Sequence, residues 1–147
     1  MWNKDYSLQL SLWAIRIFFV LWVLFTIFGY FIVQAYVDYN GAIKAFQTIL
    51  ITLYCCLSVA IFLLNDLHQL LCNIRKDYIF TQENVTCLRK ISWLCIAVGV
   101  ITLIAAIGYA PFILVSIAFA FIALIVRVVK NIMEAAITLK EENDFTI

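Results

Sequence analysis

Four long apolar stretches run through this chain of 147 residues, and they restrict its fold more than any other feature. Each is close to the roughly 20 residues that a helix needs to cross the hydrocarbon core of a bilayer. They predict membrane spans at about 12–33, 45–64, 91–109 and 111–129. Inside lipid a segment must satisfy its own backbone amides, so each span is predicted to be a helix. The fold class is therefore all-α, an integral membrane four-helix bundle in a single transmembrane domain.

The composition excludes the soluble alternatives. Hydrophobic residues make up 66% of the chain and charged residues 13%, against about 25% charged residues in an ordinary soluble domain. A net charge of +1 supplies no surface that neutralises phosphates, so direct binding to nucleic acid is not expected. One proline and four glycines do not suit a turn-rich β-barrel. We therefore expect the chain to be embedded in a lipid bilayer, which is its predicted binding partner.

Lysine and arginine gather at one end of the predicted spans. The loop after span one carries only Lys44, and the connection between spans three and four carries none. Because short loops rich in lysine and arginine stay in the cytosol, both termini, the loop at 65–90 and the tail at 130–147 are predicted to be cytosolic. The basic residues on this side are Lys4, Arg75, Lys76, Arg89, Lys90, Lys130 and Lys140.

Arg16 and Arg127 lie within the first and fourth spans, near the ends predicted to be cytosolic. An arginine at the centre of a span costs about 2.5–3.5 kcal/mol on insertion scales. Near the interface the guanidinium reaches the head groups on its apolar stem, which lowers that cost. We expect such snorkelling for both residues. An ion pair with Asp66, or contact with an anionic lipid head group, is the alternative.

Spans two and four are predicted to extend into the cytosol as helices. No helix breaker follows Ile43 before the region of Asp77, and the fourth helix can run from Pro111 to about Glu141. We expect their apolar stripes to pack on each other as a short stalk, with a position on the bilayer surface as the alternative. The stripes have the spacing of amphipathic helices: Leu67, Leu70, Leu71 and Ile74 in one, and Val129, Ile132, Met133, Ala136 and Leu139 in the other.

The third helix is predicted to begin in the cytosol near Gln82. Thr81 is a favourable N-cap, and Glu83 in the first turn suits the positive end of the helix dipole. Asn84 stands at the position from which a side chain reaches back to the cap in a capping box, although glutamate or glutamine is usual there. The loop at 65–90 is thus expected to contain two helix ends and a short connection.

The residues around this connection resemble a known pattern. The runs Ile74-Arg75-Lys76, Phe80-Thr81-Gln82-Glu83-Asn84 and Leu88-Arg89-Lys90-Ile91 are similar to the signature of domain of unknown function family 2975, a family of small bacterial four-span membrane proteins. The ending Asp144-Phe145-Thr146-Ile147, after an acidic stretch, also resembles that of the family. Asp77 stands where the family tends to have glycine, and Ile79 where proline is common. The turn after span two is therefore expected to differ in detail.

The resemblance implies a location in the bacterial cell (inner) membrane and no established activity. Members are often encoded beside a small helix-turn-helix regulator, which implies that the protein is a partner or sequestering antagonist of such a regulator. Docking on the loop and tail would keep the regulator off DNA.

The predicted cytosolic loop and the C-terminal tail carry opposite charge. Residues 75–90 contain four basic and two acidic side chains, whereas residues 141–147 contain three acidic side chains. The tail either closes on the loop as a structural cap or forms with it a surface for a cytosolic protein. The candidate residues for either role are Arg75, Lys76, Phe80, Thr81, Glu83, Asn84, Leu88, Arg89, Glu142, Asn143, Asp144, Phe145, Thr146 and Ile147.

The sequence offers no candidate for catalysis, a cofactor or a metal ion, so we expect that the protein is not an enzyme. It contains no Ser-His-Asp set, phosphate-binding loop or carboxylate pair within a span, and the single histidine, His68, has no companion ligand at a metal-binding spacing. Two alternatives to a regulator partner stay open. One is a membrane-stress or peptide-immunity protein that acts through the outer loop at 34–44. The other is a transporter or channel subunit, which requires a homo-oligomer because four spans leave little room for a pore.

Overall fold

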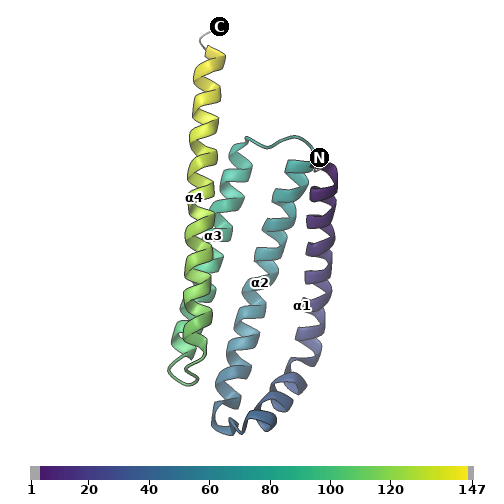
Figure 1. Cartoon of the computed structure of the whole chain (residues 1–147), viewed down its shortest axis with the longest axis vertical. Coiled ribbons are helices and arrows are strands. Elements are labelled where there is room, and N and C mark those ends of the chain that lie inside the picture. Colours follow the sequence, from purple (N-terminus) through teal and green to yellow (C-terminus); the bar gives the residue numbers. More distant parts are fainter. Residues whose placement is uncertain (1–3, 146–147) are drawn as a thin grey trace.

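The computed structural model describes the backbone of residues 4–145, all of it in helices and short turns (Figure 1). All four α-helices are long and apolar enough to cross a membrane. The all-α, four-helix membrane architecture predicted from the sequence is therefore confirmed, and the chain is a multi-pass membrane protein. The helices are α1 (Lys4–Asn40), the short 3-10 helix η1 (Ile43–Ala45), α2 (Phe46–Arg75), α3 (Gln82–Ala105) and α4 (Phe112–Phe145).

The chain folds back three times between two ends of the molecule. The N-terminal end of α1, the connection at 76–81 and the C-terminal part of α4 share one end, which we call the basic end (Figure 1). The turns at 41–45 and 106–111 lie at the other end, which we call the hairpin end. The second turn is longer than expected, because α3 already ends at Ala105. Gly108 lets this turn approach α2, since a Cβ there would lie 2.7 Å from Thr48 Oγ1.

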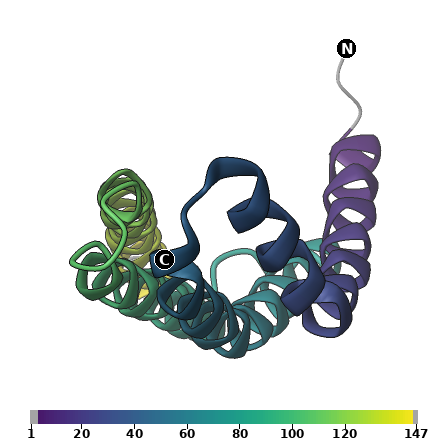
Figure 2. The same ribbon diagram turned by 90° about the horizontal axis from the view of Figure 1, so that it is seen from below.

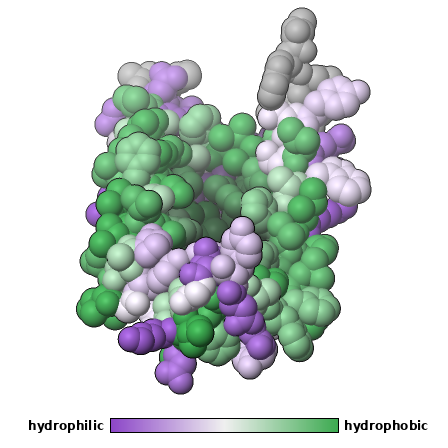
Figure 3. Space-filling model, turned by 60° about the horizontal axis from the view of Figure 1, so that its bottom comes forward, coloured by the Kyte–Doolittle hydropathy of each residue, from purple (hydrophilic) through white to green (hydrophobic). Residues whose placement is uncertain are grey.

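The helices pack strictly in chain order. Within the described residues α1 packs on α2, α2 on α3 and α3 on α4, and α1 does not reach α4. Seen along their length they form an open arc (Figure 2). Figure 3 shows the hollowed face of this arc, flanked by hydrophobic side chains. Each of the two edge helices packs against one α-helix and exposes much of its remaining apolar surface.

Helix α3 is the centre of the arc. Of its most apolar 18-residue stretch 44% is buried, against 11% for each of the other three α-helices. The expected direct contact between the stripes of α2 and α4 is wrong, because α3 lies between these helices and packs against both. Leu67, Ile74 and Met133 instead pack on a common cluster that α3 dominates: Leu70, Cys87, Leu88, Ile91, Cys95 and Ala123.

Small and hydroxyl residues bring α3 and α4 close together. Ser92 Oγ donates to the Ala123 carbonyl at 3.1 Å, and Ser116 Oγ donates to the Gly99 carbonyl at 2.8 Å. Gly99 faces the backbone of α4, where the Ser116 oxygen would lie 3.6 Å from an added Cβ. Such close approach with interhelical hydrogen bonds is how helices associate in lipid, where the hydrophobic effect does not drive them together.

The α1–α2 contact also includes side-chain hydrogen bonds to carbonyl groups, and in one of them the Tyr54 hydroxyl donates to the Thr26 carbonyl at 3.4 Å. Trp22 Nε1 donates to the Leu57 carbonyl at 2.8 Å, so this mid-span tryptophan packs between helices. At the hairpin end the hydroxyls of Tyr36 and Tyr109 lie 2.6 Å apart and connect α1 to the turn at 106–111. These contacts help to join α1, an edge helix, to the rest of the arc.

We predict that Gly99 tolerates alanine but not leucine. An added methyl group would make an ordinary contact of 3.6 Å, whereas a leucine side chain would push α4 away. The leucine variant is expected to lose about 1–3 kcal/mol of stability, as overpacked helix interfaces do. Thermal unfolding of both variants in detergent checks this, and equal stability of the two would contradict the close packing of α3 on α4.

Candidate functional site

The connection at 76–81 begins with a helix C-terminal motif. The Asp77 amide donates to the Ile74 carbonyl at 3.1 Å, and the Tyr78 amide donates to the Asn73 carbonyl at 3.1 Å. Asp77 has a φ of 61°, the left-handed conformation that this Schellman motif requires. Glycine adopts this conformation without strain. Residues with a Cβ are strained there, and asparagine and aspartate are strained less than most. The chain therefore keeps the turn although aspartate occupies the position.

Asn84 joins the two sides of the connection. Its side chain is fully buried, and Nδ2 donates to the carbonyls of Tyr78 at 2.7 Å and Ile79 at 2.8 Å. Its Oδ1 accepts a hydrogen bond from Asn73 Nδ2 at 3.0 Å. Two loop carbonyls and the end of α2 are thus bound by one residue in the first turn of α3.

The predicted start of α3 is confirmed, but the predicted role of Asn84 is not. Thr81 is the N-cap, and its hydroxyl accepts a hydrogen bond from the Asn84 amide at 3.4 Å. The Asn84 side chain turns away from the cap and does not complete a capping box. Its amide nitrogen instead supplies two donors to the carbonyls of the connection.

The candidate loop residues therefore separate into two groups. Asn84 and Leu88 are buried and hold the connection and the core together, with Thr81 partly exposed beside them. The exposed group consists of Arg75, Lys76, Phe80, Glu83 and Arg89. Only this second group can contact a partner directly.

The tail candidates continue helix α4. Glu142, Asn143, Asp144 and Phe145 are exposed, and Phe145 retains 91% of its accessible surface. Figure 1 shows these last turns extending beyond the connection at 76–81, so up to Phe145 the tail does not fold back as a cap. The remaining two candidates, Thr146 and Ile147, lie outside the described residues.

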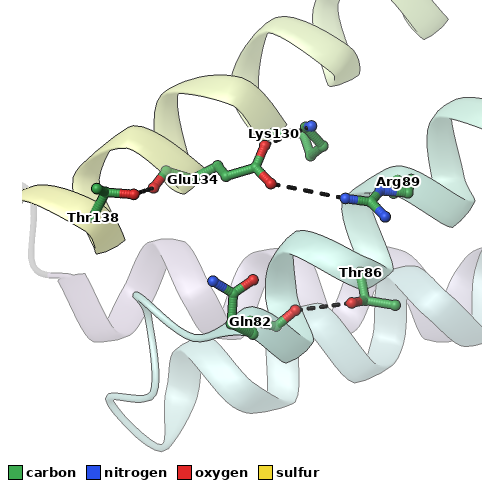
Figure 4. A network of polar contacts seen from close by, with 6 residues as sticks. All are labelled: Gln82, Thr86, Arg89, Lys130, Glu134 and Thr138. Carbon is green, nitrogen blue, oxygen red and sulfur yellow. Dashed lines mark hydrogen bonds and ion pairs between the residues drawn. The ribbon is translucent and has the colours of Figure 1, made fainter. Parts of the chain in front are cut away.

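A cluster of charged side chains lies between α3 and α4 near the basic end (Figure 4). Lys130 Nζ donates to Glu134 Oε2 at 2.7 Å, and Arg89 Nη2 lies 3.8 Å from Glu134 Oε1. Glu134 lies beyond the predicted fourth span, and the hydrogen bond from Lys130 lowers the pKa of its carboxyl group. Glu134 therefore stays ionised at neutral pH and bridges the two cations.

Both arginines within the predicted spans lie over tryptophan rings. Arg16 Cζ is 5.8 Å from the ring centroid of Trp13, and Arg127 Cζ is 5.7 Å from that of Trp93. The second pair belongs to the charged cluster, where a cavity of about 310 Å³ opens between α3 and α4. This cavity is lined by Arg89, Ser92, Trp93, Arg127, Lys130 and Asn131. The sequence shows Arg89 and Arg127 only as separate residues. That both line one cavity depends on how α3 and α4 align.

The described residues contain no group of three or more histidine, cysteine, aspartate or glutamate side chains that could hold a metal ion. What the basic end offers is cations, an exposed helix end and aromatic side chains. Such groups bind anions or protein surfaces.

A family model described as a protein of unknown function, DUF2975, matches residues 6–147. It thus covers both the connection and the charged cluster. No curated protein and no solved structure matches the chain significantly.

We predict that Asn84→Ala destabilises the protein more than Thr81→Ala. The first change removes three hydrogen bonds of the buried Asn84 side chain, and we expect it to cost about 2–4 kcal/mol. The second removes one capping bond and should cost about 1 kcal/mol. Chemical unfolding in micelles measures both values, and a larger loss for Thr81→Ala would refute the role of Asn84.

We also predict that Asp77→Gly is more stable than Asp77→Ala by about 1 kcal/mol. Both variants lack the carboxylate, so their difference reports only the cost of a left-handed residue with a Cβ. The same unfolding measurement serves here. Equal stabilities would mean that the turn relaxes out of the left-handed conformation.

Proposed function

The chain belongs to DUF2975, a family of proteins of unknown function, and from this membership and its fold we propose that it is a non-enzymatic membrane protein that docks a cytosolic partner. The partner that fits best is a small helix-turn-helix regulator, held at the membrane and away from DNA. In this proposal the basic end faces the cytosol of a bacterial cell, and the hairpin end faces outward.

The observation that carries the proposal is the exposed apolar stripe on the projecting part of α4. Ile132, Ala135 and Leu139 recur at helical spacing and are exposed, with Ile132 at 64% and Leu139 at 66%. The opposite face, with Met133 and Ile137, turns inward. A helix with an unpartnered apolar stripe beyond the predicted span suits a groove or helix of a partner protein.

The charge at the end of α4 supports a basic partner. Glu141, Glu142 and Asp144 are exposed close to the apolar Leu139 and Phe145. A DNA-binding protein carries lysine and arginine where it meets phosphates, so an acidic helix end can occupy the same surface. Binding here and binding to DNA would then exclude each other.

The hydroxyl groups within the helices support a role without catalysis. Thr52 Oγ1 donates to the Thr48 carbonyl at 2.6 Å, and Thr102 Oγ1 donates to the Val98 carbonyl at 2.9 Å. Ser92 and Ser116 bind carbonyls across the α3–α4 contact. These groups are engaged in helix structure and packing, so the proposal assigns them no chemical step.

The mechanism is a change in the affinity for the regulator. A hundredfold change requires about 2.8 kcal/mol of differential binding free energy. Burial of one large apolar side chain contributes about 1.5–3 kcal/mol, so the stripe and Phe145 together are sufficient. A movement of α4 relative to α3 would alter how much of the stripe a partner can cover.

We predict that deletion of residues 141–147 weakens the affinity for the regulator at least tenfold. The double change Ile132→Ser and Leu139→Ser should weaken it by a similar factor. The measurement is binding of a fluorescent small helix-turn-helix regulator to the full protein in nanodiscs, with the candidate regulator taken from the neighbouring genes, as the family resemblance implies. The deletion tests the acidic end, and the double change tests the stripe.

The matched control is Ile107→Ser at the hairpin end, compared with Phe145→Ser. Both side chains are 91% exposed, so neither change disturbs the core. Only the Phe145 variant should weaken binding. If all variants recruit the regulator equally, the docking surface is not on α4.

A cavity at the hairpin end favours peptide immunity as the second candidate. It has a volume of about 500 Å³, and its lining includes Tyr30, Asp38, Ile43 and Lys44. Aromatic, apolar and oppositely charged side chains together suit a membrane-active peptide at the outer surface. In that case changes at Asp38 and Lys44, rather than in α4, would abolish the function.

A further inference from the structure

Counted along α4 from its start, the charged cluster falls at the depth expected for lipid head groups. Helix α4 begins at Phe112, and at 1.5 Å per residue Arg127 follows about 22 Å and Lys130 about 27 Å along its axis. A hydrocarbon core of roughly 30 Å therefore ends near these two residues. Trp93 is 58% exposed at the same level of α3, and tryptophan is enriched at membrane interfaces.

The cluster carries more positive charge than it neutralises. Arg89, Arg127 and Lys130 line one cavity of about 310 Å³, and Glu134 bridges Lys130 and Arg89. Within the described residues no carboxylate pairs with Arg127, whose guanidinium lies against the Trp93 ring instead. One guanidinium and the free donors of the other cations thus remain for a ligand.

We propose that this cavity binds the phosphate of an anionic phospholipid, with Arg127, Lys130 and Arg89 as donors and Trp93 beside the glycerol region. Arginine and lysine recognise phosphate through charge-assisted hydrogen bonds, and arginine adds a planar, bidentate geometry. The interaction is stronger at the membrane interface than in water, because the local dielectric constant is lower.

The surroundings of the cavity suit a lipid better than a soluble anion. Toward the hairpin end the outer faces of α3 and α4 expose the apolar side chains of Val100, Leu124 and Val128. Acyl chains attached to a phosphate in the cavity would lie along this surface. Ser92 and Asn131 on the lining add a hydroxyl and an amide that can bind glycerol or head-group hydroxyls.

The test uses native mass spectrometry of the full protein released from detergent after titration with phosphatidylglycerol or phosphatidylcholine. We expect the unmodified protein to retain phosphatidylglycerol at least tenfold more strongly than phosphatidylcholine. The double change Arg127→Gln and Lys130→Gln should abolish this preference.

The matched control is Arg75→Gln with Lys76→Gln. Both residues are exposed at the basic end, and the pair removes the same two charges outside the cavity. General attraction to anionic lipid falls equally in both double variants. A difference in phosphatidylglycerol retention between them therefore reports a specific site. Equal retention by the two would overturn the proposal.

Two further measurements test the guanidinium geometry and distinguish a lipid from free phosphate. Arg127→Lys preserves the charge but loses the planar guanidinium, so it should fold and still weaken phosphatidylglycerol retention about threefold; unchanged retention would argue against the site. In the second measurement inorganic phosphate competes with the lipid. Full displacement at millimolar phosphate would identify a site for free phosphate and reject the lipid.

Discussion

The hydrogen bonds of Asn84 determine where the rest of the basic end lies. By binding Tyr78, Ile79 and Asn73, this side chain fixes the start of α3 against the end of α2. Because α3 is one rigid helix, that start also sets which of its residues meet each neighbour. Leu88 then points into the core, and Arg89, one position later, lies opposite Glu134 of α4.

The sequence was sufficient for the number of spans, the extension of α2 and α4 and the N-cap at Thr81. It was insufficient to predict that the helices pack side by side in chain order. In a soluble helix the buried face is apolar and the other polar, but in lipid both faces are apolar, so periodicity does not distinguish them. The central position of α3 was missed for this reason. The end of α3 at Ala105 was missed because Ala106 and Ile107 continue the apolar run, so hydropathy does not mark the turn.

Of the candidate site, the sequence identified the correct segments but mixed two kinds of residue. Asn84 and Leu88 belong to the fold, whereas Phe80 and Glu83 remain on the surface. The charged cluster was missed because its members come from two helices, and Arg127 meets Trp93 only in the observed alignment. The structure thereby separates two surfaces at the basic end, the groove between α3 and α4 and the outer stripe of α4.

The chain-order packing has a consequence for biogenesis. A polypeptide enters the membrane from its N-terminus onward, so α3 reaches the translocation machinery before α4 does. At that moment Ser92 lacks the Ala123 carbonyl to which it later donates, and Gly99 faces lipid instead of α4. The first two helices, largely lipid-facing in the finished protein, can settle early. The second pair completes its contacts only after the fourth helix leaves the translocation machinery.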